Sequence, residues 1–225
     1  MATTLAERMN HFSGSPTSAL IATVAELKRQ GKNIISLNVG EPDFGTPDYI
    51  KVAGIKAIAE NFTKYTPGNG ILELRQEIVK KLKEDNGVEY ALNEVTTAVG
   101  AKQAIASSLM VIAGPGDEVL LPIPCWVSYT EMIRLAGAEP VFVPVRSDNY
   151  ELDMDAIEKA ITPKTKAIVI CTPNNPTGAV YSEKDLRRLA ELAVEHDFFI
   201  VADEIYEMLV YDGAKHFSVA SISRE

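Results

Sequence analysis

The sequence predicts an α/β fold in which a mostly parallel sheet carries helices on both faces. From about residue 95 onward, short apolar runs rich in Val and Ile alternate with longer stretches whose apolar residues have helical spacing. Strands that alternate with helices favour parallel pairing, because each helix returns the chain to the same end of the sheet. The predicted strands are residues 95–99, 118–121, 140–145, 167–171 and 198–202.

The composition is the second observation behind this fold class. Of the 225 residues, 46% are hydrophobic and 24% are charged, which is typical of globular proteins and excludes disordered and fibrous classes. No run of 18 apolar residues is present, so we expect no membrane span. The net charge of −9 opposes nucleic-acid binding. With two cysteines and no apolar leader segment, we expect no disulfide framework and a cytoplasmic protein.

The helices between the strands follow from apolar spacing and from the residues that begin and end them. Ser182 with Asp185 is typical of a helix start, and Gly87 is typical of a helix end. Before residue 95 the order of elements changes, so we expect the first 45 or so residues to belong to a separate lobe or an arm. The predicted helices are 17–30, 48–60, 70–86, 101–112, 126–135, 154–161 and 183–195.

Ligands of open parallel sheets bind beyond the carboxyl ends of the strands, so the residues there are the candidate site. The turn Gly100, Ala101, Lys102 leads from a predicted strand into a helix, where free backbone N–H groups suit a phosphate or carboxylate. The alternative is a tight turn that needs only its glycine. The loop 172–178 holds two prolines and two adjacent asparagines, so Asn175 can donate to a ligand oxygen; an Asn-Pro turn is the alternative.

Two further residues follow strand ends. Asp203 ends an apolar strand, and because a buried carboxylate is costly without a partner, we expect it to face a cation or a hydrogen-bond donor. A capping or internally paired Asp is equally compatible with this segment. Trp126, the single tryptophan, is either core or a plate for a planar ring. Together the strand ends match a cofactor with a phosphate, a flat ring, a ring oxygen and a protonated ring nitrogen.

Five segments resemble those of class I aminotransferases, the pyridoxal-phosphate enzymes of fold type I, and most closely the bacterial aspartate aminotransferases. They occur in the order of that family and extend over nearly the whole chain. The segments are Asn-Val-Gly-Glu-Pro-Asp at 38–43, Tyr-Thr-Pro-Gly-Asn-Gly at 65–70, Pro-Cys-Trp-Val-Ser-Tyr at 124–129, Pro-Asn-Asn-Pro-Thr-Gly at 173–178 and Ala-Asp-Glu-Ile-Tyr at 202–206.

The resemblance implies a role for each matching residue on the cofactor side. Ala101 and Lys102, after Gly100, would offer backbone N–H groups to the phosphate of pyridoxal 5'-phosphate; many relatives have Gly or Ser in place of Ala101. Trp126 would stack on the pyridine ring. Asp203 would pair with the ring nitrogen and keep it protonated, which makes the ring an electron sink.

The resemblance also implies substrate contacts and a partner. Asn175 and Tyr206 would share the 3-oxygen of the ring, and Asn175 would lie near the substrate carboxylate, as would Trp126. Gly40 would place its backbone against the α-carboxylate of the substrate. Tyr65 would reach the phosphate held by a neighbouring subunit, which implies a homodimer. The expected reaction moves an amino group between an aspartate-like amino acid and a 2-oxo acid, with no metal.

One departure from the family pattern concerns the lysine that forms the Schiff base. In the family it follows the Asp-Glu-Ile-Tyr segment at some distance, and none of the 14 lysines here has the matching context. We therefore expect a chain truncated before this lysine and inactive alone. The same segments also serve carbon–sulfur lyases and aminocyclopropane-carboxylate synthases, and a non-catalytic ligand-binding module is the alternative from another class.

Overall fold

The computed structural model describes residues 5, 9, 16–37 and 39–223. Contacts divide the chain into two units, residues 1–12 with 69–225 and residues 13–68. Asn38, the first residue of one segment that carries the resemblance, lies outside the described residues.

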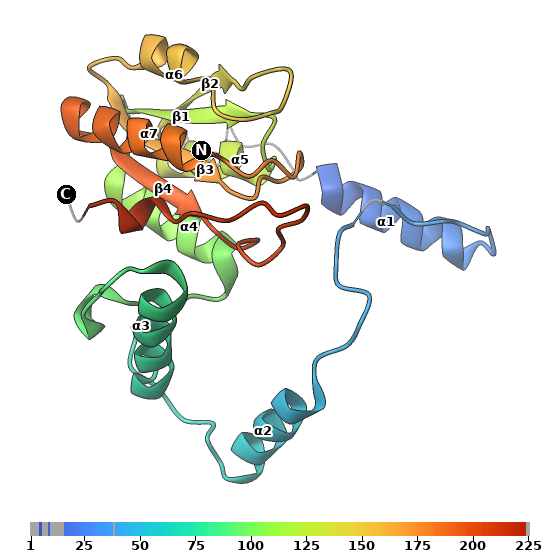
Figure 1. Ribbon diagram of the computed structural model, residues 1–225. Helices are drawn as coiled ribbons and strands as arrows, with labels where there is room; N and C mark the ends of the chain where they lie inside the picture. The colour runs from blue at the N-terminus through green and yellow to red at the C-terminus, as the bar shows by residue number, and fades with distance from the viewer. Residues whose placement is uncertain (1–4, 6–8, 10–15, 38, 224–225) are drawn as a thin grey trace, which may run out of the picture. The chain divides into compact units, whose positions relative to one another are not determined.

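A parallel sheet of four strands forms the centre of the larger unit (Figure 1). The strands are β1 (Glu118–Ile123), β2 (Glu139–Pro144), β3 (Thr165–Cys171) and β4 (Phe199–Asp203). They lie in the order β2-β1-β3-β4, and every neighbouring pair is parallel. The predicted parallel α/β class is confirmed. All strands therefore end at the same edge of the sheet, and Trp126 follows β1, Asn175 follows β3 and Asp203 ends β4.

The first predicted strand, residues 95–99, is wrong. Val95 has extended backbone angles (φ −117°, ψ 129°), yet this segment pairs with no strand among the described residues. Instead, the Thr97 N–H donates to the carbonyl of Asn69, 3.1 Å away, in the connection before a helix. An apolar, β-branched sequence sets the local backbone conformation, but a strand also needs a neighbour for its ladder.

Helices cover both faces of the sheet, as the sequence predicts (Figure 1). On one face lie α4 (Gly100–Ile112) and α5 (Ser128–Ala136), and on the other lie α6 (Met154–Ala160) and α7 (Glu183–His196). At the start of α7, the Ser182 hydroxyl accepts a hydrogen bond from the Asp185 N–H at 3.2 Å, which confirms the predicted helix start.

The two faces have separate hydrophobic cores because successive strand residues point to opposite sides. In β1, Val119 and Leu121 pack with α4 and α5, whereas Leu120 packs with α7; all three are fully buried. A strand buried on both sides requires apolar residues at every position, which explains the continuous Val and Ile runs. The sheet therefore rests on two cores of similar size.

Helix α3 (Leu72–Asn86) and the short 3-10 helices η2 (Leu92–Glu94) and η3 (Val219–Ser221) complete this unit. Helix α3 ends at Gly87, whose φ of 70° lies in the left-handed region that glycine adopts at low cost. The predicted end of this helix is confirmed, and its start lies two residues later than predicted.

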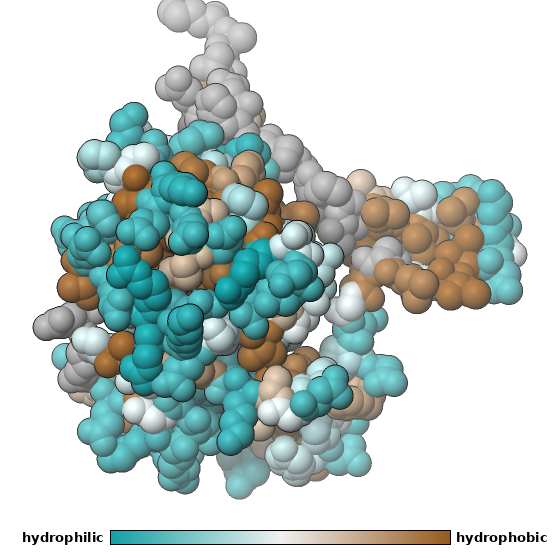
Figure 2. Space-filling view, turned by 45° about the horizontal axis from the view of Figure 1, so that its top comes forward, coloured by the Kyte–Doolittle hydropathy of each residue, from teal (hydrophilic) through white to brown (hydrophobic). Residues whose placement is uncertain are grey.

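The second unit contains α1 (Pro16–Arg29) and α2 (Asp48–Ala59). No residue between 19 and 68 whose burial is described is buried. Apolar side chains stand at the surface of α1, among them Leu20 at 52% exposure and Ile21 at 47% (Figure 2). These helices thus form from local sequence without a core of their own. No helix within the described residues is long and apolar enough to cross a membrane.

Candidate functional site

The N-terminus of α4 forms the first part of the candidate site. Gly100 opens the helix with φ 78°, and a Cβ atom at this position would meet nothing within 4 Å. The glycine is therefore required by backbone conformation and not by crowding. Helical N–H groups of the first turn have no partner within the helix, so those of Ala101 and Lys102 are available to an anion.

The aromatic part of the site is Trp126, which is half-buried at the end of the loop after β1. The Lys102 ammonium nitrogen lies 4.9 Å from the centre of its ring, a cation–π geometry. The ring of Tyr129 meets Trp126 edge to face, with 5.3 Å between centroids and 89° between planes. These contacts hold Trp126 beside the α4 turn and bring two predicted site residues together.

Asp203 ends β4 with a side chain that is 7% exposed. Its Oδ2 accepts a hydrogen bond from the Tyr129 hydroxyl at 2.7 Å, and its Oδ1 accepts one from the Ile205 N–H at 3.1 Å. The expectation that this carboxylate faces a donor is therefore confirmed. Tyr129 is a residue that the sequence analysis did not single out. A signal was present, because the predicted helix 126–135 would place residues three positions apart on one face, although the observed α5 begins at Ser128, after Trp126.

Burial favours the protonated forms of the tyrosine hydroxyl and of the two cysteine thiols near this carboxylate. It raises the pKa of the Tyr129 hydroxyl far above its usual range, and the neighbouring Cys171 and Asp203 raise it further. It also raises the pKa of the Cys125 thiol to about 11 and that of Cys171 above its usual value. At neutral pH, Tyr129 is a hydrogen-bond donor and both cysteines are thiols, which are poor nucleophiles.

The loop 172–178 contributes two asparagines with different surroundings. Asn174 is buried and serves the loop itself: its Oδ1 accepts from the Thr177 N–H and hydroxyl at 3.2 and 2.9 Å, and its amide donates to the Tyr181 hydroxyl at 3.2 Å. Asn175 is less buried, and its amide nitrogen donates to the Tyr206 hydroxyl at 3.3 Å. The structure thus brings Asn175 together with Tyr206, which follows Asp203 by three residues.

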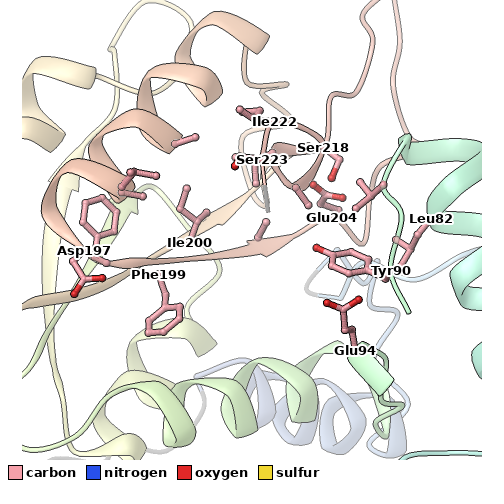
Figure 3. Close-up of a pocket in the computed structure, with 18 residues that line it drawn as sticks. Leu82, Tyr90, Glu94, Asp197, Phe199, Ile200, Glu204, Ser218, Ile222 and Ser223 are labelled. Carbon is pink, nitrogen blue, oxygen red and sulfur yellow. The ribbon is translucent and has the colours of Figure 1, made fainter. Parts of the chain in front are cut away.

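A cavity of about 810 Å³ lies along β4, and none of the predicted site residues lines it. Figure 3 shows Glu204 and Ser218 toward one end of this cavity and Asp197 and Phe199 toward the other. Because successive strand residues alternate in direction, Glu204 faces this cavity while Asp203 faces Tyr129 on the other side of the sheet. The candidate site therefore lies on the α4–α5 face.

A polar cluster beside this cavity connects α3 to the segment after β4. Glu207 accepts hydrogen bonds from the Lys81 ammonium group and, at 2.6 Å, from the Asn86 amide. Although burial acts to raise it, these bonds hold the pKa of Glu207 below its usual value. Burial raises the pKa of the neighbouring Glu204, whose Oε1 lies 3.9 Å from the His216 Nε2. The cluster joins two parts of the chain that are distant in sequence.

Two predicted site residues, Gly40 and Tyr65, belong to the unit of residues 13–68. The side chain of Tyr65 is fully exposed, and a Cβ atom at Gly40 would meet nothing within 4 Å. Their roles at the site stay predictions.

The arrangement can bind a planar, phosphate-bearing ligand. The α4 turn offers N–H donors for the phosphate, Trp126 offers a flat apolar face, and Asn175 with Tyr206 offers donors for a ring oxygen. Asp203 offers a negative charge, fixed by two hydrogen bonds, for a protonated ring nitrogen. This donor set fits the cofactor that the sequence analysis expects.

Comparisons with known proteins agree over almost the whole chain. Residues 32–225 match the family model described as aminotransferase class I and II. The chain is 46% identical over 222 residues to an aspartate aminotransferase of Bacillus sp. (strain YM-2), covering 98% of this chain and 57% of the relative. It is also 46% identical to a probable aspartate/prephenate aminotransferase of Thermus aquaticus, over 98% of this chain and 58% of the relative.

Solved structures give the same result. The aspartate aminotransferase from Thermus thermophilus with maleate superimposes with a TM-score of 0.95 at 44% sequence identity. The superposition covers 98% of this chain and 58% of that one. An alanine aminotransferase from Pyrococcus furiosus has a TM-score of 0.92 at 33% identity. The chain thus spans a little under three-fifths of the length of these proteins.

Proposed function

The chain belongs to the aminotransferase class I and II family, and from this premise we propose that it forms part of an enzyme that transfers an amino group between an amino acid and a 2-oxo acid with pyridoxal 5'-phosphate. The observation that carries the proposal is the buried carboxylate of Asp203, fixed by Tyr129 and the Ile205 N–H close to an aromatic plate, Trp126. Such a carboxylate needs a cationic ligand to offset its burial.

Each part of the cofactor has a matching group in this chain. When bound, pyridoxal 5'-phosphate supplies a protonated pyridine ring that withdraws electrons from the substrate. The backbone N–H groups of Ala101 and Lys102, after Gly100, hold the phosphate, and Trp126 holds the ring face. Asp203 keeps the ring nitrogen protonated, because an opposite charge within hydrogen-bond distance stabilises the cation.

The remaining groups orient the ring and the substrate. Asn175 and Tyr206, already hydrogen-bonded to each other, donate to the 3-oxygen of the ring. In this proposal Asn175 and Trp126 also contact the substrate carboxylate, and the backbone of Gly40 contributes a further contact to it. An aspartate-like substrate is supported by the names of the relatives, which are aspartate and aspartate/prephenate aminotransferases. Those names favour this reaction over the lyase and synthase alternatives.

Assembly and compartment belong to the same proposal. Tyr65 reaches the phosphate held by a second copy of the chain, so the active form is a homodimer. The compartment that we propose for it is the cytoplasm. The domain division also remains a proposal, with an arm and part of a smaller lobe at 1–45 and the cofactor-binding domain at 46–225.

Binding, and not turnover, is the appropriate test, because the anchoring lysine of the family has no match in this chain. Trp126 is the only tryptophan, so quenching of its fluorescence reports a ligand stacked on it. We expect saturable quenching by pyridoxal 5'-phosphate, and a loss of at least tenfold in affinity for Asp203→Asn, since a neutral amide cannot stabilise the pyridinium.

Lys102→Ala discriminates the backbone account of phosphate binding from a side-chain account. It removes the ammonium group but keeps the N–H, so we expect a change in affinity of less than threefold, measured by equilibrium dialysis. A loss as large as that of Asp203→Asn would contradict the backbone account. Absence of saturable binding to the unsubstituted chain would contradict the proposed cofactor.

A further inference from the structure

Beyond its hydrogen bond to Asp203, Tyr129 has no assigned role in the proposed function. It lies in the first turn of α5 and is 1% exposed, so its hydroxyl is removed from water. A buried hydroxyl without a hydrogen-bond partner is costly, and this one donates a hydrogen bond to the Oδ2 of Asp203, 2.7 Å away. The same ring meets Trp126 edge to face. One side chain thus contacts both the carboxylate and the aromatic plate of the candidate site.

The carboxylate of Asp203 has two donors within the described residues, one for each oxygen. The Ile205 N–H, on Oδ1, is backbone and comes from the turn that directly follows the strand. The Tyr129 hydroxyl, on Oδ2, comes from a different element, 74 positions away in sequence. Only the second donor therefore fixes the carboxylate plane relative to α5 and Trp126.

The Tyr129 hydroxyl is the donor in this pair, and the Oδ2 of Asp203 is the acceptor. Burial raises the pKa of the Tyr129 hydroxyl far above neutrality, and the charge of Asp203 adds to this. Tyr129 donates and Asp203 accepts, and the carboxylate oxygens have further lone pairs with which to accept from another partner. A charge-assisted hydrogen bond of this kind is stronger and shorter than one between neutral groups.

We infer that Tyr129 is a positioning residue, which holds the Asp203 carboxylate and the Trp126 ring in one fixed geometry so that both address the same planar ligand. The inference rests on the proposed function, because the ligand's ring nitrogen is what Asp203 would address. A carboxylate held in place loses less conformational freedom when it pairs with the ligand, which strengthens that pairing.

The test compares two ligands that differ at one atom. Pyridoxal 5'-phosphate has a ring nitrogen for Asp203, whereas its benzene analogue has a C–H there and shares the phosphate and the stacking face. We expect the unsubstituted chain to prefer the pyridine ligand at least tenfold, by Trp126 fluorescence titration. Tyr129→Phe keeps the aromatic ring and removes the hydroxyl, so it should reduce this preference about fivefold while the affinity for the analogue changes less than twofold.

Two further variants separate positioning from general structural damage. Tyr181→Phe removes another buried tyrosine hydroxyl, one that packs in the opposite core, and it should leave the preference unchanged. In a double-mutant cycle, Tyr129→Phe should have no further effect on the preference once Asp203 is Asn, because the hydroxyl acts through that carboxylate. Tyr129→Phe that weakens both ligands equally, or an additive effect in the cycle, would overturn the inference.

The experiment also distinguishes this inference from the proposed function. If the unsubstituted chain binds both ligands equally, or neither, the pairing of Asp203 with a ring nitrogen is wrong and the inference is wrong with it. If the unsubstituted chain shows the preference and Tyr129→Phe retains it, the proposed function stands and the role of Tyr129 is contradicted.

Discussion

Both units of the chain contain α-helices, but the side chains of these helices differ in how deeply they are buried. In the unit of residues 69–225 with 1–12, α7 buries leucines completely between itself and the sheet. In the unit of residues 13–68, α2 has no buried residue, and Ile58 on this helix is 70% exposed. Local helix signals are thus sufficient to define an element, but they do not supply the burial that stabilises it.

The difference extends to the candidate site. The site residues of the larger unit are connected through a series of contacts from Lys102 through Trp126 and Tyr129 to Asp203. Tyr65, in the other unit, is fully exposed. A side chain becomes pre-organised only where packing and hydrogen bonds restrict it. The following predictions test how far this contrast holds.

The largest effect is expected from removing one apolar side chain in each unit. Leu189 in α7 is fully buried, so Leu189→Ala should lower the free energy of unfolding by about 2–4 kcal/mol through lost burial and a cavity. Ile58→Ala, on the exposed face of α2, should change it by less than about 0.5 kcal/mol. Urea denaturation followed by circular dichroism measures both. Equal losses of unfolding free energy in the two variants would show that α2 also packs against a hydrophobic core, and would contradict the contrast between the units.

An intermediate effect is expected from two neighbouring asparagines within the larger unit. Asn174→Ala removes two hydrogen bonds inside the loop 172–178 and one to Tyr181, and it should cost about 2 kcal/mol of stability, since the Thr177 donors and the buried Tyr181 hydroxyl lose their partner. Asn175→Ala should leave stability within about 0.5 kcal/mol and instead weaken pyridoxal 5'-phosphate binding. Thermal unfolding and fluorescence titration of both variants check this. The reverse pattern would exchange the structural and ligand-binding roles of the pair.

The smallest effect is expected from two glycines that end helices. Gly87 follows α3 with φ 70°, and Gly31 follows α1 with φ 77°, so alanine is strained at both positions. Gly87→Ala should lower the global free energy of unfolding by about 1 kcal/mol, because α3 belongs to the larger unit. Gly31→Ala should lower only local helicity. A shift of the main denaturation midpoint by Gly31→Ala would show that α1 unfolds together with the larger unit.

Much of the larger unit was predictable from sequence because its signals are local. Short, continuous apolar runs predicted four of the strands, apolar residues at helical spacing predicted the helices between them, and Ser182 and Gly87 marked helix ends. The rule that ligands bind beyond parallel strand ends pointed to Asn175 and Asp203, whereas Gly100 was reached through a predicted strand at residues 95–99 that the structure does not contain. Residues 95–99 were misassigned for the complementary reason: the apolar pattern specifies an extended backbone, whereas pairing depends on which strand lies alongside.

The sequence by itself determined the α/β class, the helix limits to within two residues and the chemical types of the site residues, because these depend on neighbours within a few positions. Only the tertiary structure decided which partners those residues have. The Tyr129 hydroxyl donates a hydrogen bond to Asp203, 74 positions away in sequence. The Asn174 amide donates to the Tyr181 hydroxyl, whereas the Asn175 amide donates to the Tyr206 hydroxyl. Hydrogen bonds between distant segments depend on strand order and register, which no local pattern encodes.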